Sequence, residues 1–488
     1  MASLEELRAL RLQKAEALRQ KGENPYPSET SRTHTVSELL SLWSKLQKKK
    51  KIILSGRIRA IRGQGGLIFF NLDDGTGSFQ GALQKGDTPE EALSSFAESA
   101  DVGDFIEAEG SLFLTKRGEK TLLVKRWKML VKSLRPLPDK WHGLQDTEER
   151  FRRRYLDLVM DGEVKERFLV RSRIISGIRQ FLEKDGFVEV ETPMFQPLYG
   201  GASAVPFTTH YKALETDFYL RISPELYLKR LMAGGMPKVF ELNRNFRNEG
   251  IDVTHSPEFT MLEFYAAYET ADSERVFVEK MLKTIVKKVL GNTQVKFEDT
   301  SIDFSKKFAV VSYFDLFKRF AGLNSAEKMK QAELEVEAKR LGAEVAPGDN
   351  AMKILDNIYK KHCRPKLIQP TFIIDYPAEM LPLAKRKIDN PELVDAFQLI
   401  IGGMEMVKAF SELNDPIDQR ARFEEQEKSK KLGDKEAQSL DEDFLECMEY
   451  GIPPAGGVGI GIDRLTMLLT NVKNIREVIL FPTLKPKS

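Results

Sequence analysis

The feature that most constrains the fold is a change of pattern at residue 52, where helical periodicity gives way to short β segments. Between Ile52 and Leu134, five such segments follow one another, separated by turns rich in glycine and aspartate. Short strands at this density, within about 100 residues, are typical of a small barrel, and barrels that bind oligonucleotides are one such architecture. The sequence therefore predicts a β-barrel domain over residues 51–140.

A helical extension, residues 1–50, precedes the barrel. Ser3 and Glu6 have the spacing of a capping box, leucines then recur at helical spacing, and a Gly-x-x-Pro sequence ends the helix. A second helical stretch, Val36–Leu46, leads into four lysines at 48–51. This lysine run is equally compatible with a solvated surface and with added affinity for nucleic-acid phosphates.

The rest of the chain, residues 141–488, alternates helices with segments that look like antiparallel strands. A charge-rich, mostly helical stretch at about 271–366 looks like an insertion. Together with the barrel, this pattern predicts an α+β protein whose second domain is an antiparallel sheet with helices. Its strands are predicted at Phe187–Pro193, Phe218–Ser223, Lys238–Asn243, Glu258–Tyr268, Thr371–Tyr376, Phe397–Phe410 and Gly457–Ile462.

Composition excludes several classes of protein. The chain has 488 residues, of which 41% are hydrophobic, so it is neither disordered nor collagen-like. It has no run of about 18 apolar residues and its N-terminus is too charged for a signal peptide, so we expect a cytoplasmic protein without a membrane partner. Two cysteines provide neither a disulfide framework nor a zinc cluster. A net charge of +2 leaves nucleic-acid binding open, because such binding depends on local patches.

Two stretches of the second domain place charges where packing does not explain them. FRNEG, followed by THSPEF, carries Arg247, Glu249 and His255 in a loop between two predicted strands. GVGIGIDRL is a strand that runs into a helix, with Arg464 in the first helical turn, where the helix dipole disfavours a cation. A nearby anion would compensate, so Arg464 favours a phosphate ligand.

Strand parity brings an acid and a phenol together. Glu263 and Tyr265 are two residues apart on one predicted strand, so their side chains point to the same face. A carboxylate beside a phenol, flanked by apolar residues, is unusual for the core of a sheet but suits a cationic ligand. An opposite charge at about 4 Å is worth about 4 kcal/mol at an effective dielectric constant of about 20.

With GFVEVETP at Gly186–Pro193, these stretches resemble the three signature sequences of the class II aminoacyl-tRNA synthetases, in the same order. The similarity is greatest to the bacterial-type lysyl-tRNA synthetases and covers nearly the whole chain, including KWHGLQDTEERFRRRYLDL at 140–158, SPELYLKRL at 223–231 and SELNDP at 411–416. The resemblance implies a five-stranded OB-fold barrel for the anticodon, a class II catalytic domain, and a homodimer whose interface includes the GFVEVETP strand and the helix before it. It also implies an ATP-dependent, AMP-forming ligase that activates L-lysine and transfers it to the 3′ end of tRNA(Lys).

The resemblance assigns roles to individual residues. The attacking carboxylate is already ionised at pH 7, so catalysis depends on positioning and charge stabilisation without a general base. The catalytic residues implied are Arg247, Glu249 and Arg464. ATP is expected to bind to Arg247, His255, Phe259, Glu405 and Arg464, with Phe259 stacked on adenine. Lysine is expected to bind to Gly201, Glu225, Glu263, Tyr265, Phe410 and Glu412.

A predicted hairpin offers a candidate Mg²⁺ site. A two-residue turn at Gly402-Gly403 pairs Gln398 with Val407, so Gln398 and Glu405 become diagonal neighbours about 7–8 Å apart, which one hydrated Mg²⁺ would bridge. The related synthetases usually have Glu at both positions, and Gln398 is a weaker ligand. They also usually have Asn where this chain has Lys408, whose flexible stem we expect to carry its charge towards a phosphate or a neighbouring carboxylate.

On the barrel, Phe69 and Gln80 match the positions that stack on and contact anticodon bases in the related synthetases. Adjacent strand residues face opposite ways, so only one of Phe69 and Phe70 belongs to the core. Parity does not decide which.

Two other functions remain open from the sequence. A related ligase adds lysine to a translation factor in place of tRNA, but that enzyme lacks a barrel. An RNA-binding paralogue that activates no amino acid is the second alternative, and the changes at Gln398 and Lys408 give it some support.

Overall fold

The computed structural model describes residues 3–64, 66–138, 144–346, 348–431 and 439–487. The chain divides into two units, Met1–Leu144 and Gln145–Ser488. The domain boundary predicted at residues 140 and 141 lies outside the described residues. None of the helices in the described part of the chain has the length and hydrophobicity needed to span a bilayer.

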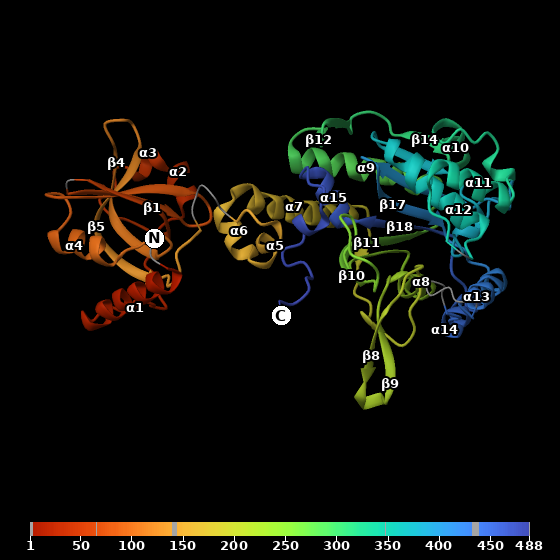
Figure 1. Ribbon diagram of the computed structural model, residues 1–488, viewed down its shortest axis with the longest axis horizontal. Coiled ribbons are helices and arrows are strands. Elements are labelled where there is room, and N and C mark those ends of the chain that lie inside the picture. Colours follow the sequence, from red (N-terminus) through yellow and green to blue (C-terminus); the bar gives the residue numbers. More distant parts are fainter. Residues whose placement is uncertain (1–2, 65, 139–143, 347, 432–438, 488) are drawn as a thin grey trace. The chain divides into compact units, whose positions relative to one another are not determined.

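The first unit contains a closed barrel with the strand order β1-β2-β3-β5-β4. It is drawn in red to orange in Figure 1. Phe70 is buried in its core, whereas the preceding Phe69 faces outward and is only partly buried. The predicted five-stranded barrel is confirmed, and the structure decides between the two phenylalanines. The elements are β1 (Ile52–Gln64), β2 (Leu67–Asp73), β3 (Ser78–Gln84), α4 (Glu90–Ser99), β4 (Phe105–Leu114) and β5 (Lys120–Val131).

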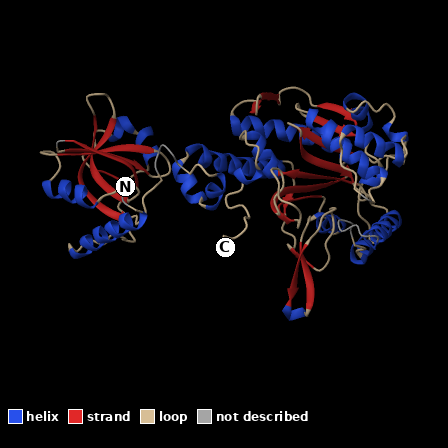
Figure 2. Ribbon diagram, in the orientation of Figure 1, coloured by secondary structure: helices blue, strands red, loops and turns tan. Residues whose placement is uncertain are grey.

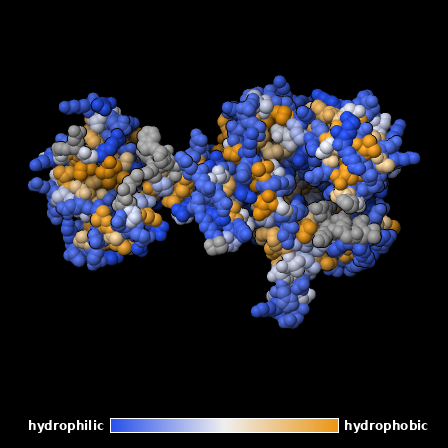
Figure 3. Space-filling view, in the orientation of Figure 1, coloured by the Kyte–Doolittle hydropathy of each residue, from blue (hydrophilic) through white to orange (hydrophobic). Residues whose placement is uncertain are grey.

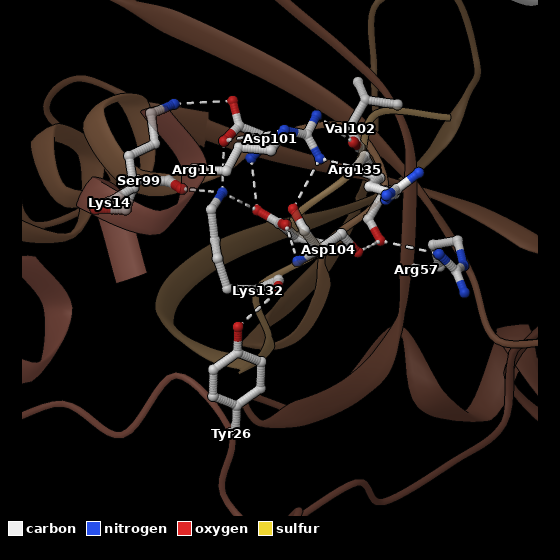
Figure 4. Close-up of polar contacts among 12 residues, drawn as sticks. Arg11, Lys14, Tyr26, Arg57, Ser99, Asp101, Val102, Asp104, Lys132 and Arg135 are labelled. Atoms are coloured by element: carbon white, nitrogen blue, oxygen red, sulfur yellow. Dashed lines mark hydrogen bonds and ion pairs between the residues drawn. The ribbon is translucent and has the colours of Figure 1, made fainter. Parts of the chain in front are cut away.

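Helix α1 (Leu4–Gln20) is fastened to this barrel by buried charges. The Glu6 amide donates to Ser3 Oγ at 3.2 Å, which completes the predicted capping box. Arg11 donates to three backbone carbonyl groups of the barrel unit, and beside it the buried ammonium of Lys132 lies 2.6 Å from Asp104 (Figure 4). The helix predicted at 36–46 is interrupted, and forms α2 (Val36–Ser41) and α3 (Trp43–Leu46).

The second unit is built on an eight-stranded sheet in the order β14-β15-β16-β17-β18-β11-β10-β6. Its neighbouring strands are antiparallel, except for the two edge pairs β14 with β15 and β10 with β6. Helices lie on the outside of these strands (Figure 2), so the sheet is covered as an α+β fold requires. The strands are β6 (Val188–Glu189), β10 (Lys238–Phe246), β11 (Glu258–Ala267), β14 (Ala309–Ser312), β15 (Thr371–Ile374), β16 (Ala396–Ile401), β17 (Met404–Ser411) and β18 (Ala455–Gly461).

Two predicted segments differ in detail from the structure. The strand predicted at 187–193 is only two residues long, because after the Val190 amide bonds to Phe240 the chain turns away from the sheet. The stretch 271–366 holds strands as well as helices, and α9 (Ala271–Leu290) packs into the same core as the sheet. Part of the predicted insertion therefore belongs to the sheet layer. Its other elements are β12 (Gln294–Phe297), β13 (Thr300–Asp303), α10 (Tyr313–Phe320), α11 (Gln331–Leu341) and α12 (Ala351–Ile358).

The unit also contains a three-stranded sheet in the order β7-β9-β8. Its hairpin of β8 and β9 projects from the unit (Figure 1). The face of the hairpin visible in Figure 3 is mostly hydrophilic. Its strands are β7 (Phe195–Gln196), β8 (Phe207–Tyr211) and β9 (Thr216–Leu220). The remaining helices of the unit are α5 (Thr147–Arg152), α6 (Arg154–Met160), α7 (Gly162–Lys184), α8 (Glu225–Ala233), α13 (Pro416–Lys431), α14 (Glu442–Glu449) and α15 (Ile462–Leu469).

Candidate active site

The site lies over three glycines of β18, near the middle of the large sheet. Gly457, Gly459 and Gly461 alternate along the strand, so one face of β18 carries no side chains there. A Cβ atom at Gly457 would lie 1.9 Å from Oε1 of Glu412, and one at Gly459 would lie 2.3 Å from Cε of Met261. The bare strand forms the floor of a cavity of about 290 Å³.

The register of the sheet sets which side chains surround this floor. Glu263 on β11 and Lys408 on β17 both pair with Gly459, from opposite sides. In the next row, Tyr265 and Phe410 both pair with the glycine two positions earlier. Residues paired across strands share a face, so all four side chains border the bare strand, and all four line the cavity.

Acidic groups gather at one end of the cavity. Ser223 Oγ donates to Glu263 Oε1 at 3.0 Å, and the Tyr265 hydroxyl donates to Glu263 Oε2 at 3.2 Å, so the acid and the phenol meet as strand parity predicts. Glu225 begins α8, and its amide donates to Ser223 Oγ at 3.1 Å. Burial raises the pKa of Glu263 to about 8, and the neighbouring Glu225 acts in the same direction. A cation entering here would lower that pKa and bind the ionised acid.

Of the described residues predicted to bind lysine, only Glu412 does not line the cavity. It forms an ion pair with Lys229, whose ammonium also lies 2.8 Å from Oε1 of Glu225. Sequence reasoning missed Lys229. The available signal was its i,i+4 spacing from Glu225, because a lysine and a glutamate at that spacing are neighbours if the segment is a helix.

Arginine and aromatic groups form the other end. The Arg247 guanidinium lies over the Phe259 ring, 5.0 Å from its centroid. Its Nε atom is buried and has no hydrogen-bond partner within the described part of the chain. Burial lowers the pKa of Arg247, while Glu249 and Glu263 oppose that change. A buried donor without a partner beside an aromatic face suits an anionic ligand that carries a ring.

Arg464 and His255 complete this end. From the first turn of α15, Arg464 donates to the Glu405 carbonyl and to His255 Nε2, both at 3.1 Å. Arginine has only donors, so Nε2 accepts and the imidazole proton lies on Nδ1, 2.8 Å from Oδ2 of Asp252. Both side chains line the cavity together with Glu405, Glu249 and Phe259.

Sequence reasoning also missed the buried Asp463, which fixes the start of α15. One of its oxygens accepts from the Thr260 amide at 2.7 Å, and the other accepts from Arg171 at 2.6 Å. These bonds tie α15 to β11 and α7, and so hold the neighbouring Arg464 in place. The available signal was that Asp463 directly precedes Arg464 in the sequence GVGIGIDRL.

The predicted pairing of Gln398 with Val407 is wrong. A β-bulge between Leu399 and Ile400 shifts the register, so that Gln398 pairs with Lys408. A bulge adds one residue to one strand, and a turn length alone does not reveal it.

The residues present fit Mg²⁺ only in part. Glu405 lines the cavity, but Gln398 does not, and its Oε1 accepts a hydrogen bond from the Tyr376 hydroxyl at 2.9 Å. Among the described residues, no group of three or more His, Cys, Asp or Glu side chains is placed to hold a metal. Such a site does not suit an all-protein cage. It suits an ion that takes most of its ligands from phosphates and water, with Glu405 as the protein ligand.

The two predicted anticodon residues lie together on the outer face of the barrel. Phe69 on β2 pairs with Ala82 on β3, two residues from Gln80 on the same face. The Gln80 side chain is oriented by its donation to Thr121 Oγ1 at 2.8 Å. A partly buried ring beside an amide is suited to stacking on a base and contacting its edge.

Residues 146–485 match the family described as tRNA synthetases class II (D, K and N). The chain belongs to this family. Residues 52–130 of this synthetase match the OB-fold nucleic acid binding domain. It is 47% identical over 486 residues to a protein of Pelotomaculum thermopropionicum named lysine–tRNA ligase, covering 99% of this chain and 96% of that one. A protein of Carboxydothermus hydrogenoformans with the same name is 46% identical over 484 residues, with 99% of both chains covered. The predicted family and fold class are confirmed.

Proposed function

We propose that this protein is a lysine–tRNA ligase, which activates L-lysine with ATP and then transfers it to the 3′ end of tRNA(Lys). The observation that carries the proposal is one cavity with buried acids at one end and two guanidinium groups at the other. A substrate with two ammonium groups and one carboxylate fits the first end, and nucleotide phosphates fit the second. Relatives with this name, 46% and 47% identical over nearly the whole chain, support the choice of lysine.

At the acidic end, Glu225 binds the α-ammonium group of lysine, and Tyr265 and Glu412 bind the side-chain ammonium. Glu263 supplies a further charge, and Phe410 packs against the methylene stem. Gly201 allows close approach, since a Cβ there would lie 2.8 Å from the Glu225 Cβ. In this orientation the substrate carboxylate points towards the guanidinium end.

At the other end, Arg247 binds the α-phosphate of ATP and the attacking carboxylate. Arg464 and His255 bind the outer phosphates, and adenine stacks on Phe259. A carboxylate oxygen forms a bond to the α-phosphorus, the bond from that phosphorus to the bridging oxygen breaks, and pyrophosphate leaves with the electron pair. Arg247 stabilises the charge that accumulates on the phosphorus oxygens. The neighbouring carboxylate of Glu249 favours the charged form of Arg247.

Glu405 would hold a Mg²⁺ ion, which neutralises phosphate charge when bound. We also propose that the protein is a cytoplasmic homodimer. Apolar side chains at Val188, Met194 and Phe195 are exposed by 51%, 46% and 38%, and exposed apolar residues close together in the chain are typical of a subunit surface.

Amino-acid-dependent exchange between ATP and labelled pyrophosphate tests the first step. We expect exchange with lysine and with none of the other standard amino acids at comparable concentration. Transfer of labelled lysine to tRNA(Lys) tests the second step. Exchange with an amino acid that lacks a side-chain ammonium would contradict the proposal.

The closed barrel is the observation that favours tRNA over a translation factor as lysine acceptor. Replacing Phe69 by Ala should raise the KM for tRNA about tenfold, because stacking on one base is worth about 1–3 kcal/mol. Lysine-dependent exchange should not change, since it needs no tRNA. A matched substitution of the buried neighbour, Phe70→Ala, should instead lower the melting temperature of the protein, because it removes a core side chain.

A further inference from the structure

Lys229 is a buried cation that the proposed chemistry does not use. It lies on α8, one turn after Glu225, and is 1% exposed. Its ammonium contacts Glu225 and Glu412 and lies 5.6 Å from the centre of the Phe410 ring. Burial opposes its charge, but Glu225 and Glu412 outweigh burial and raise the pKa of Lys229 to about 12. The ammonium is therefore permanent at physiological pH.

The charges around this lysine form a simple sum. Burial raises the pKa of both Glu263 and Glu412, so these acids ionise fully when a cation binds beside them. With Glu225, Glu263 and Glu412 all ionised, the acidic end carries three negative charges, and Lys229 cancels one of them. Two uncompensated negative charges remain, the number needed for the two ammonium groups of a diamino acid. A monoamino acid brings only one ammonium group, so one of these acids would stay protonated and its charge pair would not form.

The geometry also leaves one oxygen free. Glu412 is 1% exposed, and neither of its oxygens has a hydrogen-bond partner within the described residues. Only Oε2 forms the ion pair with Lys229, which leaves Oε1 outside both kinds of contact. This oxygen lies 1.9 Å from the position that a Cβ of Gly457 would occupy, so it faces the bare strand at the cavity floor. Its Oε2 is held by Lys229.

We propose that Lys229 is a positioning and specificity-determining residue, which holds Glu412 and Glu225 by one oxygen each and sets the net charge of the pocket to match a diamino acid. This inference rests on the proposed function, since it assigns how lysine is chosen. Lys229 acts through the two glutamates and does not itself touch the substrate.

A double-mutant cycle tests this role, with the KM for lysine and the KM for ATP measured by pyrophosphate exchange. Lys229→Met should raise the KM for lysine at least about 30-fold, because it leaves buried carboxylates unpaired, while the KM for ATP changes by less than about threefold. In a Glu412→Gln background the same change should cost much less, because the two residues act as a unit. Equal losses in both backgrounds, or no loss, would overturn the inference.

The control is Lys283→Met, which removes another i,i+4 lysine–glutamate ion pair, to Glu279 at 2.7 Å on α9. It should leave both KM values unchanged. If Lys229→Met does not fold, Lys229→Arg decides: the displaced charge should raise the KM for lysine about tenfold and leave that for ATP unchanged. An unchanged KM for lysine in Lys229→Arg would then overturn the inference.

The same measurements separate the two proposals. If exchange by the unmodified protein does not depend on lysine, the proposed function fails and the role of Lys229 fails with it. If that exchange depends on lysine but the Lys229 variants match the unmodified protein, only the role of Lys229 fails.

Discussion

The two ends of the cavity are built differently. The residues of the acidic end lie on strands of the sheet and at the start of α8. Two of them, Glu263 and Tyr265, are 4% and 3% exposed. At the other end, His255 is carried by a loop between β10 and β11, and its side chain is 49% exposed. One end is thus fixed by the sheet before any ligand arrives, and the other is partly open to water.

This difference has a physical reason. Discrimination between amino acids needs buried polar groups that are left unpaired by the wrong ligand, and such groups must be held rigidly. Phosphates are bound by charge, which tolerates movement and acts over several ångströms. We therefore expect changes at the acidic end to alter the choice of amino acid, and changes at the guanidinium end to alter the rate.

The largest effect is expected at the guanidinium end. Arg247→Ala should lower kcat for pyrophosphate exchange about 1000-fold, the cost of losing a donor that stabilises transition-state charge. The equilibrium Kd for lysine, measured by calorimetry without ATP, should change little. A large loss of lysine affinity together with an unchanged kcat would reverse the roles that we assign to the two ends.

The next largest effect is expected from alanine substitutions of the β18 glycines, which distinguish the acidic end of the cavity from the guanidinium end. Gly457→Ala places a methyl group 1.9 Å from Glu412 and 2.5 Å from Tyr265, whereas at Gly461 the nearest atom is 3.8 Å away, on Arg464. Overpacking costs about 1–3 kcal/mol, so Gly457→Ala should weaken lysine binding up to about 100-fold. Gly461→Ala should have a much smaller effect on the same Kd. Similar losses in both variants would show that the floor is sensitive along its whole length.

The acidic end should also respond to pH. Glu263 has a pKa raised from 4.5 to about 8, so it is protonated in the empty pocket at neutral pH. Lysine binding must then release a proton, and lysine affinity should rise between pH 6 and 8 by up to about tenfold per unit. Calorimetry in buffers with different ionisation enthalpies measures this proton directly.

The variant Glu263→Gln provides the control, because it should bind lysine with a flatter pH profile. The sign for stability is opposite to that for affinity. The empty protein holds the extra proton between pH 4.5 and about 8, so this group's contribution to folding is complete below 4.5 and is lost as pH rises through about 8. Lysine affinity independent of pH would contradict the protonated state.

The smallest effect is expected where the two ends meet. Lys408 is partly exposed, and it pairs with Gly459 on one side and Gln398 on the other. Lys408→Asn should lower exchange roughly fivefold, since a partly screened charge near a phosphate is worth about 1 kcal/mol. A sharp rise in activity with lysine would show that Lys408 repels the substrate.

The sequence predicted the acidic end better than the hairpin beside it. Glu263 and Tyr265 could be paired from a period of two, which holds wherever a strand is regular. The partner of Gln398 was mispredicted because a bulge between Leu399 and Ile400 shifts the register by one residue. Counting residues along a strand predicts which side chains share a face only as long as no bulge adds a residue.

Other parts of the site needed the tertiary structure. The pair of Lys229 with Glu412 joins a helix to the residue that follows β17, far along the chain, and no local pattern reports such a contact. The barrel, by contrast, was predictable from its short strands, but helix α4 was not predicted, and the choice between Phe69 and Phe70 required the tertiary structure.

The bare face of β18 has a consequence for the empty protein. Most sheets are filled on both faces by their own side chains, but here three alternate positions contribute none. The amino acid and the nucleotide would pack against this bare face in place of side chains. The protein with both ligands bound should therefore have a higher melting temperature than the ligand-free protein. The bound substrates thus complete the packing of the sheet.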